Sequence, residues 1–136
     1  MSADRQLVHR TEIPIRWGDL DAYGHVNNTV FFRFMEQARV EWLATLSHAL
    51  KPHGDGPVII NAACTFLVQL NYPGTVGVEL YVGPPGRSSI PTYYEIRCEG
   101  VLVAEGESKV VWMDFASGKS VALPAAIRSR LPGADT

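Results

Sequence analysis

The sequence has few cysteines, few charges and no long apolar run. Cys64 and Cys98 are the only cysteines and do not form a Cys-x-x-Cys pair, so buried free thiols are expected. Only 19% of residues are charged, the net charge is −2 and no basic cluster occurs, which argues against nucleic acid as a partner. No run approaches the length of a membrane span, and residues 1–6 are too polar for a signal peptide. No membrane partner and a cytoplasmic location are therefore expected.

Several common catalytic patterns are also missing. There is no Gly-x-x-x-x-Gly-Lys phosphate loop, no His-Glu-x-x-His metal helix and no Gly-x-Ser-x-Gly elbow. Neither cysteine has a neighbouring His or helix N-terminus in the sequence to activate its thiol. What is present is 46% apolar residues in a chain of 136, enough for one domain with a real core. We expect a single domain over 1–136, with flexible ends at 1–8 and 132–136.

Most of the functional residues lie between Arg16 and Asn28. Asp19, Asp21, His25 and two asparagines fall in this stretch, directly before a segment with helical apolar spacing that runs from Val30 to about Leu46 without Gly or Pro. A helix N-terminus carries free N–H groups and the positive end of the dipole. A carboxylate beside such an end is a workable hydrolytic site, although Asp and Asn before a helix are often only turn formers and caps.

The rest of the chain alternates apolar and polar residues, as strands do. A first strand is expected around Ile13–Trp17, with Pro14 confining it to a sheet edge or a strand start, and residues 47–57 are expected to form a loop. A short helix is expected after Pro124. This order indicates an α+β fold with an antiparallel sheet. The later strands are predicted over Val58–Tyr72, Val76–Val82, Thr92–Glu99, Val101–Asp114 and Ser120–Leu123.

The segment Asp-Leu-Asp-Ala-Tyr-Gly-His-Val-Asn-Asn, followed by Phe-Phe-Arg-Phe-Met-Glu-Gln-Ala-Arg, resembles the 4-hydroxybenzoyl-CoA thioesterase branch of the hotdog-fold thioesterases. The resemblance extends from about Thr11 to Leu131. It implies a hotdog fold, in which an antiparallel sheet wraps around one long helix. It also implies that Asp21 is the catalytic carboxylate and that a backbone N–H near Asn28 polarises the thioester carbonyl.

The same segment resembles the catalytic segment of plant acyl-ACP thioesterases, Asp-x-Asn-x-His-Val-Asn-Asn. Asp21 and His25 match that pattern, and Tyr23 stands where that family has a catalytic Asn, so Tyr23 is kept as a substrate-binding candidate. Glu36 matches a Glu common in the helix of related bacterial acyl-CoA thioesterases. Enoyl-CoA hydration is disfavoured because its Asp-x-Asn-Pro-x-His signature is not matched.

Two further ligand sites are weighed. Arg87, Ser88 and Ser89 follow a Gly-Pro-Pro-Gly turn and are candidates for binding CoA phosphates, since Arg suits phosphate and Ser donates hydrogen bonds. A metal held by Asp19, Asp21 and His25 is disfavoured, because three such residues in one loop often occur by accident. No metal and no cofactor are therefore expected.

The predicted function is hydrolysis of acyl-CoA to a carboxylic acid and CoA, with Asp21 as general base or as nucleophile. Acyl-ACP hydrolysis and non-catalytic binding of acyl thioesters stay open as alternatives. A homodimer or a dimer of dimers is expected, because one helix cannot cover both faces of so apolar a sheet. The segment 61–65 of the partner is expected to lie near Asp21.

Overall fold

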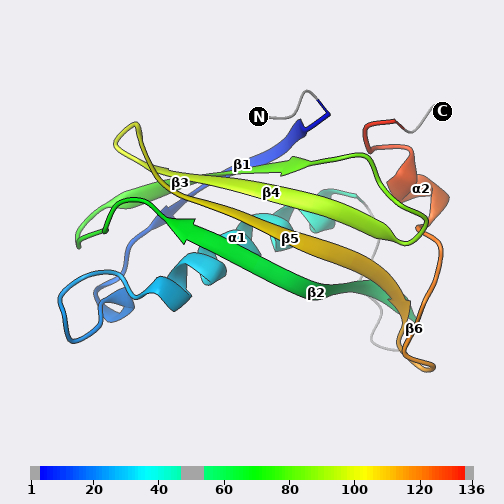
Figure 1. Ribbon diagram of the computed structural model, residues 1–136, viewed down its shortest axis with the longest axis horizontal. Helices are drawn as coiled ribbons and strands as arrows, with labels where there is room; N and C mark the ends of the chain where they lie inside the picture. The colour runs from blue at the N-terminus through cyan, green and yellow to red at the C-terminus, as the bar shows by residue number, and fades with distance from the viewer. Residues whose placement is uncertain (1–3, 47–53, 134–136) are drawn as a thin grey trace.

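The computed structural model describes residues 4–46 and 54–133 and shows one sheet packed on one long helix (Figure 1). The sheet is antiparallel, in the order β1-β3-β4-β5-β2, with β6 paired to β5. This is the predicted α+β architecture. The elements are β1 (Gln6–Pro14), the 3₁₀ turn η1 (Trp17–Asp19), α1 (Asn28–Thr45), β2 (Asp55–Phe66), β3 (Thr75–Val82), β4 (Ser89–Cys98), β5 (Val101–Asp114), β6 (Lys119–Ser120) and α2 (Ala125–Arg128).

The core lies between α1 and the inner face of the sheet. One stripe of α1 is buried, as its helical spacing predicts, and it meets alternate residues of β3 that are 0% exposed. Burying one large apolar side chain contributes about 1.5–3 kcal/mol, so each of these side chains stabilises the fold. The helix stripe is Phe31, Phe34, Met35, Ala38 and Trp42, and the facing residues of β3 are Val76, Val78, Leu80 and Val82.

A glycine on β5 sets how closely α1 approaches the sheet. A Cβ atom at Gly106 would lie 2.6 Å from Sδ of Met35 and 3.1 Å from the carbonyl oxygen of Ala63. Only a residue without a side chain leaves this space, because real Cβ contacts are longer. Met35 therefore packs directly against the backbone of β5 at Gly106.

The first strand starts earlier than predicted. Gln6 pairs with Val82 and Leu7 with Tyr81, so residues 6–8, expected to be flexible, belong to β1. Pro14 lies at the end of β1, which is an edge strand as its proline predicts.

The prediction that β2 runs from Val58 to Tyr72 is wrong at both ends. The strand begins at Asp55, inside the predicted loop, most of which lies outside the described residues. It ends at Phe66, where the N–H groups of Leu67 and Val68 both donate to the carbonyl oxygen of Val103, at 2.8 and 3.1 Å. Regular pairing of β2 with β5 stops there, because two successive N–H groups share one carbonyl acceptor. The segment 67–73 then crosses to the loop before α1, which the apolar pattern could not reveal.

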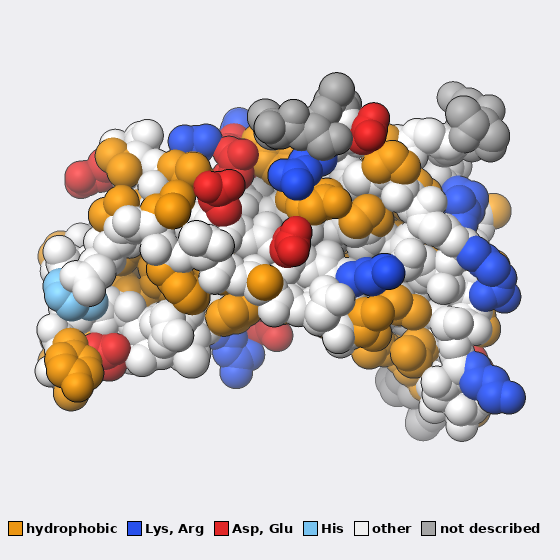
Figure 2. All heavy atoms as spheres, in the orientation of Figure 1, with side chains coloured by type: hydrophobic (Ala, Val, Ile, Leu, Met, Phe, Trp, Pro, Cys, Tyr) orange, Lys and Arg blue, Asp and Glu red, His pale blue; other side chains and the backbone are white. Residues whose placement is uncertain are grey.

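Charged and apolar side chains are intermixed on the outer face of the sheet (Figure 2), and some of the charged ones form ion pairs between strands. Arg10 of β1 pairs with Glu79 of β3, and Arg97 of β4 lies 3.5 Å from Glu79 and 2.6 Å from Glu95. Charged and apolar side chains alternate on this face, which suits contact with water. None of the described helices is long and apolar enough to cross a membrane.

Candidate active site

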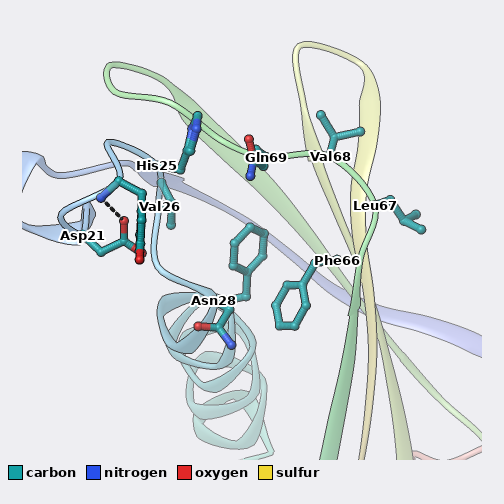
Figure 3. A pocket seen from close by; sticks show the side chains of 10 residues that line it. Asp21, His25, Val26, Asn28, Phe66, Leu67, Val68 and Gln69 are labelled. Atoms are coloured by element: carbon teal, nitrogen blue, oxygen red, sulfur yellow. Dashed lines mark hydrogen bonds between the residues drawn. The ribbon is translucent and has the colours of Figure 1, made fainter.

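The loop between β1 and α1 is closed by its own backbone. Leu20 and Val26 form an isolated bridge, the Asp21 N–H donates to the His25 carbonyl at 3.0 Å, and the Gly24 N–H donates to the Asp21 carbonyl at 3.0 Å. Gly24 has a φ of 84°, a conformation that a residue with a side chain rarely adopts. This turn places Asp21 near the start of α1, whereas the His25 ring points away from Asn28 (Figure 3).

The carboxylate of Asp21 is held by two N–H donors. Its Oδ1 accepts from the Tyr23 backbone N–H at 2.9 Å (dashed in Figure 3), and its Oδ2 accepts from Nδ2 of Asn27 at 3.1 Å. A carboxylate oxygen can accept about two hydrogen bonds, so each oxygen keeps one acceptor site for a further donor. Asp21 is half-buried and lines a cavity, so this open capacity faces a space that a ligand can enter.

The neighbouring carboxylate, Asp19, has a different environment. It is only 6% exposed, and its two oxygens accept from the Arg16 backbone N–H at 2.9 Å and from the guanidinium at 3.0 and 3.3 Å. This ion pair closes η1 and holds Asp19 away from the cavity, as a structural role predicts. Among the described residues, no group of three or more His, Cys, Asp and Glu side chains is placed to hold a metal.

The helix start lies beside Asp21. Asn27 is the N-cap, since its Oδ1 accepts from the Thr29 N–H at 2.9 Å. Asn28 is the first residue of α1, and its side chain lines the same cavity (Figure 3). Within residues 4–46 and 54–133 the Asn28 N–H has no acceptor. It is therefore free to bind a carbonyl oxygen at the positive end of the helix dipole.

A segment that the sequence assigned to a strand forms the opposite wall. Phe66, Leu67, Val68 and Gln69 line the cavity, whose volume is about 350 Å³. Three of these four side chains are apolar, and the ring of Phe66 meets Phe31 of α1 edge to face, with centroids 5.1 Å apart. The site therefore pairs a polar wall from the loop with an apolar wall from the end of β2.

Residues directly after this wall form hydrogen bonds to the loop before α1. The Val26 N–H donates to the Leu70 carbonyl at 2.9 Å, and Nδ1 of His25 lies 2.8 Å from Oδ1 of Asn71. Because an amide oxygen only accepts, Nδ1 carries the proton in this contact and Nε2 stays available. Sequence reasoning missed Asn71, which lies 46 positions after His25 without a local signal.

The other predicted substrate-binding residues are dispersed. Tyr23 lines the cavity mouth and is 88% exposed. Glu36 lies on a different groove, where its carboxylate accepts from Arg33 at 2.9 Å. Arg87, Ser88 and Ser89 lie at the other end of the sheet, beside α2, where Arg128 donates to the Arg87 carbonyl at 3.0 Å (Figure 1).

The separation of Arg87–Ser89 from the cavity follows from strand register. Ser89 pairs with Val111, and Val111 pairs with Val58 on β2. Val58 and Phe66 are eight residues apart, which is about 26 Å along a strand at roughly 3.3 Å per residue. A single chain therefore does not bring the predicted phosphate-binding residues to Asp21.

The cysteines contribute no nucleophile. Both are free and half-buried, as the expectation of free thiols requires. Cys64 lies on β2, where burial raises the pKa of its thiol to about 11. At neutral pH almost none of it is thiolate, so Cys64 is a weak nucleophile.

Comparison with known proteins identifies the family of the chain. A family model described as the thioesterase-like superfamily matches residues 15–131. The chain is 27% identical over 132 residues to the long-chain acyl-CoA thioesterase FadM of Escherichia coli K12, covering 90% of this chain and 96% of that protein.

Solved structures show the same similarity. PA2801, a candidate thioesterase from Pseudomonas aeruginosa, superposes with a TM-score of 0.86 at 41% identity, covering 91% of this chain and 98% of that one. The DHNA-CoA thioesterase of Staphylococcus aureus shares the fold, with a TM-score of 0.78 at 22% identity and coverage of 84% and 79%. The chain therefore belongs to the thioesterase-like superfamily, and it is a thioester hydrolase of the hotdog fold.

Proposed function

We propose that the protein hydrolyses acyl-CoA thioesters in the cavity between Asp21 and Phe66. The observation that carries this proposal is the pairing of a fixed carboxylate, Asp21, with the unoccupied N–H of Asn28 at the helix start. A base or nucleophile and an oxyanion donor are the two groups that thioester hydrolysis needs.

The chemistry requires little more. The thioester carbonyl oxygen accepts from the Asn28 N–H, which stabilises the negative charge that develops there. Asp21 either takes a proton from the attacking water or attacks the carbonyl carbon itself, giving an anhydride that water then cleaves. The C–S bond breaks and the sulfur leaves as thiolate, which takes up a proton from water or the site. A thiol of pKa about 8.5 leaves without a strong general acid.

His25 supplies a second polar group on the same wall. Because Nδ1 of His25 is bonded to Asn71, Nε2 is the atom that can orient Asp21 or the attacking water. Alternatively, His25 only holds the loop against segment 67–73. The apolar wall of Phe66, Leu67 and Val68 accommodates the acyl group, and Tyr23 flanks the entrance. The similarity to FadM, described as a long-chain acyl-CoA thioesterase, supports aliphatic substrates as the first to test.

A homodimer would complete the site. Strand β2 is an edge of the sheet, and Ile60 is 50% exposed near its middle, beside exposed Ala62. Twofold antiparallel pairing of two such edges centred on Ala62 places Val58 of one protomer opposite Phe66 of the other. Because Ser89 shares the row of Val58, residues 87–89 of one chain then lie near the cavity of the other, where CoA phosphates need donors.

A turnover assay over a panel of acyl-CoAs, with the matching acyl-ACPs alongside, tests the proposal. Saturable release of CoA thiol, with acyl-CoA hydrolysed at least tenfold faster than acyl-ACP, is the expected result. Faster turnover of acyl-ACP would show that the acyl group is carried by ACP, and not by CoA, in the preferred substrate. Saturable binding of every thioester with no hydrolysis would instead favour a binding protein on this fold.

A further inference from the structure

We propose that Asn27 is a positioning residue, whose side-chain amide fixes the carboxylate of Asp21 relative to the first N–H of α1. This inference rests on the proposed function. It assigns a role to one of the two asparagines before the helix, residues that are often only turn formers and caps.

Every polar group of Asn27 is occupied. The side-chain Oδ1 accepts from the Thr29 N–H at 2.9 Å and from the Thr29 hydroxyl at 2.6 Å, while Nδ2 donates to Oδ2 of Asp21 at 3.1 Å. The backbone N–H donates to the Asp19 carbonyl at 3.0 Å, and the backbone carbonyl accepts from the Val30 N–H at 3.0 Å. Only an oxygen can accept from the Thr29 N–H, so the amide nitrogen must face Asp21. The residue thus has one orientation.

The hydrogen bond to Asp21 explains why position 27 is an asparagine. Ser and Asp cap a helix about as well as Asn, so capping alone does not require an amide. Ser has no amide N–H and Asp has no donor at all when ionised, whereas Asn accepts with one atom and donates with the other. The Asn27 amide therefore caps α1 with its oxygen and holds Asp21 with its nitrogen, whereas a Ser hydroxyl would have to make both bonds with one shorter-reaching atom.

The consequence is geometric. The Tyr23 N–H holds one oxygen of Asp21 and Asn27 holds the other, so the plane of the carboxylate is fixed from both sides. Asn27 directly precedes Asn28, whose N–H is the proposed oxyanion donor. The two groups that act on the thioester are therefore linked through one side chain, and small errors in such placement are costly to rate.

Few other charges act on Asp21. Tyr23 and His25 are the titratable groups of its own loop that share the cavity, and the facing residues 66–69 carry none. Asp19 is paired with Arg16. A charge introduced at position 27 would therefore act on Asp21 with little compensation.

The test compares Asn27→Ser and Asn27→Asp, both of which keep a capping oxygen for Thr29. Asn27→Ser should lower kcat about ten- to a hundredfold with KM within about threefold, because the cap survives and only the bond to Asp21 is lost. Asn27→Asp should move the acidic limb of the pH profile of kcat upward by about one pH unit or more, since two adjacent carboxylates resist joint ionisation. The thermal midpoint of both variants should stay within a few degrees of wild type.

Ala44→Gly is the matched control, because Ala44 is exposed near the other end of α1 and the change weakens the helix without touching Asp21. It should lower the thermal midpoint and leave kcat and the pH profile unchanged. An Asn27→Asp variant with the wild-type kcat and pH profile would overturn the role of Asn27 while the proposed function stands. Wild-type protein without thioester turnover would overturn both.

Discussion

At the scale of single residues, two carboxylates two positions apart have opposite surroundings. Asp19 is buried and saturated by Arg16, whereas Asp21 is half-exposed, held by two N–H groups and open toward a cavity. A catalytic carboxylate must reach water or substrate, and only Asp21 can do so. The different roles proposed for them rest on burial and partners, because their chemistry is the same.

Substitution of each carboxylate by its amide separates these roles. Asp21→Asn should fold normally and lose about 10²–10⁴-fold in kcat, because the amide neither takes a proton from water nor attacks the carbonyl. Asp19→Asn should retain most of kcat and lose about 1–3 kcal/mol of unfolding free energy, because its pair with Arg16 is weakened. Steady-state kinetics and chemical denaturation measure the two effects. The reverse ranking in kcat would show that Asp19 is the reacting group.

At the scale of elements, edge strand β1 is fastened to α1 by a polar contact. His9 of β1 lies 2.8 Å from one carboxylate oxygen of Glu41, and Gln37 of α1 donates to the other at 2.7 Å. The hydrogen bond from Gln37, followed by that from His9, lowers the pKa of Glu41 below its ordinary value of 4.5. The contact fixes the strand that leads directly into the active-site loop.

The sign of its pH dependence follows from that shift. A carboxylate with a lowered pKa in the folded state stabilises the fold above its ordinary pKa, and the contribution is lost as pH falls through the folded value. Glu41→Gln should therefore lower the thermal midpoint at pH 7 and match wild type near pH 3. Glu12→Gln is the control, since Glu12 is exposed on β1, the strand that carries His9. If Glu41→Gln lowered the thermal midpoint by the same amount at both pH values, the charge of Glu41 would not contribute to stability.

At the scale of the whole molecule, the exposed edge of β2 supports the proposed homodimer. An unpaired edge with apolar residues invites pairing with another strand. The ion pairs between β1, β3 and β4 make the outer sheet face a less suitable interface. A second copy at β2 would cover the edge and bring residues 87–89 to the cavity.

Ala62→Arg tests this assembly, because it places a charge at the middle of the edge. Sedimentation at micromolar concentration should show a dimer or tetramer for wild type and a monomer for the variant, with at least a tenfold loss in kcat/KM. Ala44→Arg adds the same charge at an exposed position of α1 and should change neither property. A wild-type monomer with full activity would contradict both the interface and the shared site.

The sequence by itself determined the α+β class, the position of α1 and the bounds of β5, and it placed the proposed site in the loop before α1. These features depend on local periodicity. The apolar spacing predicted a helix from Val30 to Leu46, against Asn28–Thr45 observed, and the strand Val101–Asp114 was predicted exactly as found. The motif before the helix located Asp21 beside a helix N-terminus because both lie within a few residues of each other.

Tertiary structure alone decided the opposite wall of the cavity. The apolar run from Val58 to Tyr72 looks like a single strand, because periodicity records burial and not which distant segment provides it. The bonds from Val26 to Leu70 and from His25 to Asn71 join segments more than 40 positions apart, so no local signal encodes them. The same holds for the second bond of Asn27: its capping atom was predictable from position, whereas its contact with Asp21 depends on how the loop folds back.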